Sequence, residues 1–123
     1  MQNLPKERRL RGRERMGEIF ASGSHAAVGT VLARALPCPD GQGRMAAVAG
    51  KKLGGAVRRN RMRRRLRAAF RMHRERLPEG WDYALVARKG LLEAAWQDLV
   101  RDMDTAVRKA VASFGRPPSR RPG

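Results

Sequence analysis

The segment at residues 56–77 combines a predicted buried face with a dense positive charge. Its apolar residues recur at helical spacing and predict an amphipathic helix packed on a core: Met62, Leu66, Ala69, Phe70 and Leu77. Ten arginines occupy the rest, against one acid: 58, 59, 61, 63, 64, 65, 67, 71, 74 and 76. Arginines one turn apart repel one another, which disfavours the isolated helix. We therefore expect a polyanion to neutralise the exposed face; a merely solvated face is the alternative, but solubility does not require an acid-free run.

Overall composition agrees with a polyanion partner. The 123 residues have a formal net charge of +17 and a pI near 11.8, a degree of self-repulsion that is unusual for an ordinary soluble enzyme. Nucleic acid is favoured over membrane, because no apolar run approaches the roughly 20 residues of a spanning helix. A single cysteine, Cys38, excludes an internal disulfide and fits a reducing compartment, so we expect a cytoplasmic protein.

The length accommodates one domain. We expect a basic flexible N-terminus at residues 1–9, a single domain at 10–114 and a disordered tail rich in proline and arginine at 115–123. Within the domain, a short helix containing Met16, Ile19 and Phe20 should end at Gly23.

Two extended segments are predicted before the basic helix. Residues 26–36 and 45–49 read as strands joined by the turn-rich segment 37–43, which indicates a hairpin. Residues 82–88 predict a buried strand after the basic helix, so a strand-helix-strand passage implies a partly parallel sheet.

The last predicted helix has an apolar stripe of eight residues: Trp96, Leu99, Val100, Met103, Val107, Ala110, Val111 and Phe114. We assign four acids to it, Glu93, Asp98, Asp102 and Asp104, and find no good N-cap residue before it. A metal site at Asp98 and Asp102, one turn apart, is less favoured than a solvated face. The sequence therefore predicts no catalytic residue and no metal ligand.

A family resemblance is carried by residues 48–64, which read Val-Ala-Gly-Lys-Lys-Leu-Gly-Gly-Ala-Val-Arg-Arg-Asn-Arg-Met-Arg-Arg. This stretch is similar to the signature of the bacterial ribonuclease P protein family, Lys-Lys-x-Gly-x-Ala-Val-x-Arg-Asn-Arg. The similarity continues at residues 9–10, 19–23, 66–71 and 82–88, so it covers nearly all of the chain from Leu10 to Phe114.

The resemblance implies a two-layer α+β fold like the second domain of ribosomal protein S5. This fold has a mixed sheet of about four strands, three helices and a left-handed β-α-β crossover around the basic helix, although such crossovers are almost always right-handed. It also implies an accessory subunit of an endoribonuclease, monomeric on its own, whose partners are the catalytic RNA and precursor tRNA. Mg²⁺ would be bound mainly by the RNA, and none by the protein alone.

The resemblance also assigns binding residues. Those expected to contact RNA are Lys51, Lys52, Arg58, Arg59, Asn60, Arg61, Arg63, Arg64 and Arg67. Those expected to line a cleft for the 5′ leader of precursor tRNA are Phe20, Arg34, Arg59, Asn60, Arg63 and Arg67. Met16 and Arg34 stand where relatives often have aromatic residues, so charge should matter more than stacking here. The alternative role for Phe20 is packing in the core. The alternative role for Asn60 is a local hydrogen bond to the backbone near the start of the helix.

Two other functions remain open from the sequence. A ribosomal or other structural RNA-binding protein would have the same basic helix without a role in tRNA processing. A self-sufficient metal-dependent nuclease would instead depend on Asp98 or Asp102.

Overall fold

The structure, a computed structural model, describes residues 12–38 and 43–115. The predicted N-terminus at 1–9, and the predicted tail except its first residue, lie outside this range. The described part contains three α-helices and four strands: α1 (Arg13–Ser22), β1 (Ser24–Val28), β2 (Val31–Pro37), β3 (Met45–Val48), α2 (Ala56–His73), β4 (Trp81–Ala87) and α3 (Trp96–Ser113). Short 3₁₀ turns at Lys51–Leu53 and Arg74–Arg76 flank α2.

The four strands form one mixed sheet in the order β1-β2-β4-β3. β2 pairs antiparallel with both β1 and β4, whereas β3 pairs parallel with β4, so α2 makes a crossover between parallel neighbours. The predicted α+β class and the partly parallel sheet are confirmed. The left hand of the crossover stays a prediction.

The predicted hairpin is wrong. The antiparallel hairpin is formed by β1 and β2, which turn at Gly29 and Thr30, while β3 lies at the far edge of the sheet and does not pair with β2. Gly29 has a φ of 56°, and Asp102 of α3 accepts hydrogen bonds from the backbone N–H and the hydroxyl of Thr30, both at 3.0 Å. The turn is thus stabilised by a distant helix as well as by its glycine, which readily adopts the positive φ.

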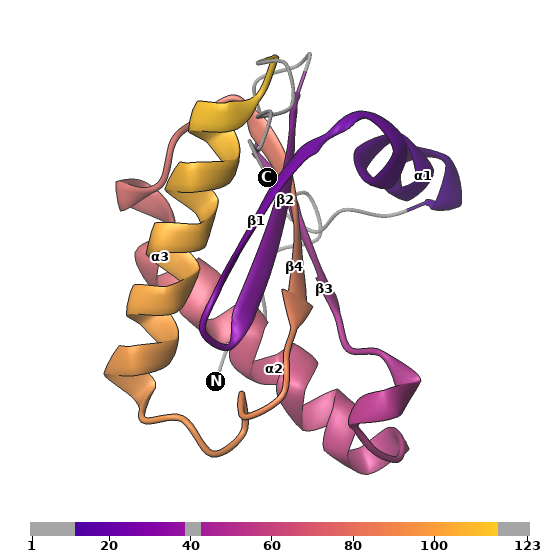
Figure 1. The fold of residues 1–123 in the computed structure, drawn as a ribbon, viewed down its shortest axis with the longest axis vertical. Coiled ribbons are helices and arrows are strands. Elements are labelled where there is room, and N and C mark those ends of the chain that lie inside the picture. Colours follow the sequence, from indigo (N-terminus) through magenta and orange to yellow (C-terminus); the bar gives the residue numbers. More distant parts are fainter. Residues whose placement is uncertain (1–11, 39–42, 116–123) are drawn as a thin grey trace, which may run out of the picture.

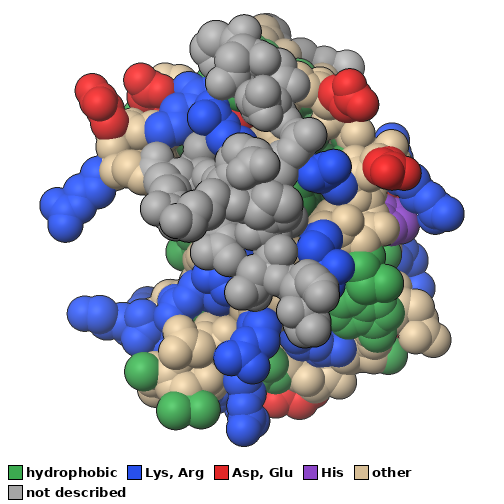
Figure 2. Space-filling view, turned by 180° about the vertical axis from the view of Figure 1, so that it is seen from behind, with side chains coloured by type: hydrophobic (Ala, Val, Ile, Leu, Met, Phe, Trp, Pro, Cys, Tyr) green, Lys and Arg blue, Asp and Glu red, His purple; other side chains and the backbone are tan. Residues whose placement is uncertain are grey.

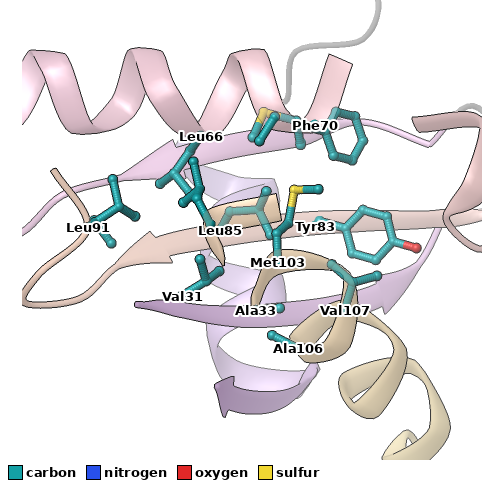
Figure 3. Close-up of a cluster of buried hydrophobic side chains, with 14 of the residues drawn as sticks. Val31, Ala33, Leu66, Phe70, Tyr83, Leu85, Leu91, Met103, Ala106 and Val107 are labelled. Atoms are coloured by element: carbon teal, nitrogen blue, oxygen red, sulfur yellow. The ribbon is translucent and has the colours of Figure 1, made fainter. Parts of the chain in front are cut away.

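The two faces of the sheet are covered differently (Figure 1). α2 and α3 pack on one face, where the core lies, and the buried side chains of Leu66, Phe70, Leu85, Met103 and Val107 meet there (Figure 3). α1 crosses the other face, where its buried Ile19 packs on Ala84 of β4. Among the described helices only α1 lies on this side, and Leu32, Val86 and Val48 of the same sheet face are half-buried.

Element boundaries differ slightly from the predictions. α2 ends at His73 and continues as a 3₁₀ turn, although Leu77 is buried as expected. β4 begins at Trp81. α3 begins at Trp96 after Ala95, whose side chain makes no capping hydrogen bond, so the absence of a good N-cap is confirmed. The assignment of Glu93 to this helix is wrong, because it lies in the preceding turn.

Among the described residues, no helix combines the length and apolar character needed to cross a bilayer.

Candidate nucleic-acid interface

The exposed side of α2 is the main candidate surface. Met62, Leu66, Ala69 and Phe70 bury one face of the helix, as the periodicity predicts. The arginines around that face have different local partners. Arg58 forms an ion pair with Glu93 at 2.8 Å, whereas Arg61 and Arg64 make no hydrogen bond or ion pair with the described part of the chain. Within the described residues, acids therefore neutralise only part of the charge on this surface.

Asn60 is tied to a neighbouring cation. Its Oδ1 accepts a hydrogen bond from Arg63 Nη2 at 2.6 Å, one turn along α2, and the side chain is exposed. The alternative of a local backbone bond is not what the structure has. Arg59 lies alongside, and its Nε donates to the carbonyl of Ala49 at 3.1 Å, so α2 is tied to the end of β3. This arrangement holds the polar groups of Asn60 and Arg63 side by side at the surface.

The turn before α2 adds further charge. Lys51 and Lys52 are exposed in the 3₁₀ turn, and Figure 2 shows Lys and Arg side chains gathered at this lower end of the molecule, around α2. Gly54 follows with a φ of 138°, and a Cβ there would lie 2.6 Å from Arg58 Cδ. The glycine lets Arg58 fold back and donate to the carbonyl of Leu53 at 3.2 Å. The signature glycine thus shapes the turn that presents the two lysines.

A second group lies on the sheet face that α1 covers. Phe20 is 42% exposed, so the alternative of core packing is wrong, and Ile19 fills the core position beside it. The Arg34 guanidinium carbon lies 4.5 Å from the Phe20 ring centroid, a cation–π contact. Arg34 Nε is buried and has no hydrogen-bond partner in the described part. Phe20 and Arg34 therefore form a cation–π pair at the surface, and Arg34 Nε remains without a hydrogen-bond partner beneath it.

Small side chains separate this pair from α2. Strand register aligns Arg34 of β2 with Ala84 of β4 and Ala46 of β3 on the same face of the sheet. The next row of that face contains Leu32, Val86 and Val48, all half-buried, and the chain then reaches Ala49, to which Arg59 is bonded. The sheet thus connects the Phe20–Arg34 pair with the Arg59 and Asn60 end of α2 by a floor of short aliphatic side chains. Arg63 follows one turn farther along α2, and Arg67 one turn beyond it.

A buried carboxylate fixes α1 over this floor. Asp82, at the start of β4, is fully buried and accepts hydrogen bonds from Arg15 Nε of α1 at 2.8 Å and from Arg44 Nη2 at 3.1 Å. Burial alone would raise the pKa of Asp82, but hydrogen bonds from Arg44 and Arg15 outweigh it and hold that pKa below its ordinary value. Sequence reasoning did not identify these three residues; the available signal was an acid at the start of an otherwise buried strand.

Two acids of α3 have partners of their own within the described residues. Asp98 pairs with Arg101 at 3.0 Å, and both contacts of Asp102 described above go to Thr30. Within residues 12–38 and 43–115, no three His, Cys, Asp or Glu side chains lie close enough together to hold a metal ion. A nuclease site at Asp98 and Asp102 has no support from this geometry.

Comparisons with known proteins agree on one family. The Ribonuclease P family model matches residues 4–111. The ribonuclease P protein component of Desulfosudis oleivorans is 34% identical over 112 residues, covering 91% of this chain and 93% of its own. That of Synechococcus elongatus is also 34% identical, over 92% of this chain and 98% of its own.

Solved structures agree with these sequence matches. The RNase P protein of Thermotoga maritima superposes with a TM-score of 0.74 at 25% identity, over 82% of this chain and 96% of that one. A mutant RNase P protein of Staphylococcus aureus, at 20% identity, shares the fold with a TM-score of 0.75, over 86% of this chain and 90% of that one. The chain belongs to the ribonuclease P protein component family, as shown by the family model, the sequence matches and the shared fold with its basic crossover helix.

Proposed function

We propose that this chain is the protein subunit of ribonuclease P, a cytoplasmic protein, monomeric on its own, that assists removal of the 5′ leader from precursor tRNA. The observation that carries the proposal is the floor of short side chains running from the Phe20–Arg34 pair to the Arg59 end of α2. Short side chains let an extended single strand approach the sheet closely. A cationic edge along that floor would bind the phosphates of the strand.

α2 would bind the catalytic RNA. Its exposed arginines, with Lys51 and Lys52, form a surface that RNA phosphates can neutralise. One guanidinium group can donate two parallel hydrogen bonds to two oxygens of the same phosphate. Asn60 supplies an amide beside Arg63, suited to a base edge or a 2′-hydroxyl. Neutralising about six phosphates would give a slope of about −4 to −5 for log affinity against log salt.

The cleft would bind the leader. The exposed ring of Phe20 can stack on one base, which is worth about 1–3 kcal/mol by alanine substitution. The Arg34 guanidinium lies over the Phe20 ring and can bind a phosphate of the leader or take part in stacking on the base. The protein would hold the leader and screen phosphate repulsion, while hydrolysis belongs to the RNA subunit with Mg²⁺ bound mainly to RNA phosphates.

Reconstitution tests the proposal. The protein is mixed with a cognate RNA subunit at low Mg²⁺, and mature 5′ ends are measured on a precursor tRNA. We expect cleavage with both subunits and an intact precursor with the protein alone; cleavage without the RNA subunit would contradict the proposal. Binding to ribosomal RNA with no effect on 5′ maturation would instead identify a structural RNA-binding protein.

Two variants separate the leader cleft from assembly. Phe20→Ala should weaken binding of a precursor with a leader about tenfold, and should leave binding of leaderless tRNA unchanged. Phe114→Ala is the matched control, because that ring is 37% exposed but packs edge-on against Trp81, away from the cleft. Equal losses for tRNA with and without a leader would show that Phe20 does not contact the leader.

A third variant tests α2. Replacing Arg59, Asn60 and Arg61 together by alanine should weaken assembly with the RNA subunit while circular dichroism stays unchanged. An unaltered affinity would refute the assignment of these three residues.

A further inference from the structure

A separate pocket lies on the other flank of α2, between this helix and the turn that leads into α3. Its volume is about 620 Å³. Four arginines of α2 line it, Arg58, Arg61, Arg64 and Arg65, facing Leu92 and Trp96. At 100° per residue, Arg61 and Arg65 lie on the opposite flank of the helix from Arg59 and Arg63, the cleft residues. The pocket is therefore distinct from the leader cleft.

Arg65 builds the wall of this pocket. Its Nη1 donates to the carbonyl oxygens of Leu91 at 2.7 Å, Ala94 at 3.0 Å and Leu92 at 3.3 Å, so one guanidinium holds the turn before α3 against α2. The same group lies 5.7 Å from the Trp96 ring centroid, which orients the indole. The indole thus lies beside a guanidinium that three carbonyl oxygens hold in place, so Arg65 is used by the fold itself.

Only some of the arginines that line the pocket have an acidic partner within the described residues. Arg58 is paired with Glu93, and this hydrogen bond holds the pKa of Glu93 below its usual value, so the acid is charged at neutral pH. Arg61 and Arg64 are exposed and, within the described residues, bond to nothing. These two guanidinium groups, unpaired within the described residues, lie beside the Trp96 indole and form a site for an anion joined to a flat ring.

We propose that this pocket binds one unpaired nucleotide of the catalytic RNA, with its phosphate on Arg61 and Arg64 and its base against Trp96 and Leu92. The inference rests on the proposed function, because it takes RNA as the partner of α2. A phosphate alone would use only the cations, and an apolar ligand would leave them unneutralised. A nucleotide matches both features of the pocket, and α2 would then contact RNA on both of its flanks.

Fluorescence of Trp96 is the direct test. In a Trp81→Phe background Trp96 is the only tryptophan, and the protein is titrated with a single-stranded RNA pentamer of adenosine. We expect quenching of Trp96, and about tenfold weaker binding of an abasic pentamer with the same phosphates, because one stacked base is lost. Inorganic phosphate at equal phosphate concentration should leave the fluorescence unchanged. No quenching by the adenosine pentamer, or equal affinity for the abasic one, would overturn the proposal.

Charge-matched variants identify the phosphate contacts. Arg61→Gln with Arg64→Gln should weaken pentamer binding at least tenfold and reduce its salt slope by about 1.4, the loss of two phosphate contacts on the single-strand scale. Arg74→Gln with Lys109→Gln removes the same charge away from the pocket and should change the affinity less than threefold. Equal effects of the two double variants would show that only net charge matters, and would refute the pocket.

The RNA subunit separates the two proposals. Weaker assembly of the Arg61 and Arg64 variant, with the control variant unaffected, supports the pocket in the complex. Full affinity of that variant for the RNA subunit, with active cleavage, would refute the pocket and leave the proposed function standing. Failure of the wild-type protein to bind the RNA subunit, with Trp96 still quenched by the pentamer, would refute the proposed function and leave a single-strand binding pocket.

Discussion

Replacing Asp82 with asparagine should remove the main anchor of α1 without changing the size of the side chain. The carboxylate accepts from Arg15 Nε at 2.8 Å and from Arg44 at its backbone N, Nε and Nη2, at 3.1 to 3.2 Å. An asparagine can accept with only one of its two terminal atoms, and its amide donors would face guanidinium donors. Arg15 and Arg44 would then lose the buried carboxylate that they share, although Arg15 would keep its ion pair with Glu18 at 2.8 Å.

The magnitude follows from burial. Removing one member of a buried ion pair costs about 3–5 kcal/mol, because the remaining charge is left unpaired. Asp82 is fully buried, but the side chains of Arg15 and Arg44 are 20% and 28% exposed and can regain some hydration. We therefore expect the lower end, about 3 kcal/mol of unfolding free energy. This corresponds to a fall in Tm of about 10 °C for a domain of this size.

Urea unfolding followed by circular dichroism measures this loss, and its pH dependence tests the cause. Because the pKa of Asp82 is below its ordinary 3.8 in the folded state, its contribution is complete above about pH 5 and is lost as pH falls through the folded-state pKa. The difference in unfolding free energy between the wild type and Asp82→Asn should therefore be smaller at pH 3 than at pH 7. Asp98→Asn is the control, since this half-exposed carboxylate pairs only with Arg101 at the surface and should contribute less than about 1 kcal/mol. A loss below about 1 kcal/mol at pH 7, or a difference unchanged down to pH 3, would refute the reasoning.

Four further variants test the packing around the interface by thermal or urea unfolding. Gly29→Ala should destabilise the protein by at least about 1 kcal/mol, because φ is 56° and the new Cβ would lie 2.2 Å from Asp102 Oδ2. Gly17→Ala in α1 is the matched control: its Cβ meets nothing within 4 Å, and it should stabilise the protein by about 0.5–1 kcal/mol. Leu66→Ala, at a fully buried site of α2, should lower the unfolding free energy by about 2–5 kcal/mol, and a change below 1 kcal/mol would contradict the packing in Figure 3. Arg65→Gln should cost about 1–3 kcal/mol and loosen the turn before α3, seen as faster amide exchange at residues 91–95; unchanged exchange would show that the three carbonyl contacts do not stabilise this turn.

The positions of the helices were readable from sequence because their signals are local. The stripe through Met62, Leu66 and Phe70 repeats within a single segment, and burial on one side requires that spacing whatever the helix packs on. The glycines that end or precede helices, such as Gly23, act on their own backbone neighbours. Strand pairing was less readable, and the hairpin was misplaced because the turn at Gly29 is stabilised by Asp102, far along the chain.

The sequence by itself determined that this protein has one basic crossover helix, with its apolar stripe inward and its arginines outward, because periodicity and charge are properties of consecutive residues. Only the tertiary structure decided which arginines remain available to bind a partner. Arg65 is used to hold a turn and Arg58 is paired with Glu93, whereas Arg61 and Arg64 beside them bond to no described residue. The physical reason is that a guanidinium nitrogen forms a hydrogen bond with a carbonyl or carboxylate oxygen only within about 3.5 Å. Which oxygens come that close to an arginine depends on how distant segments pack.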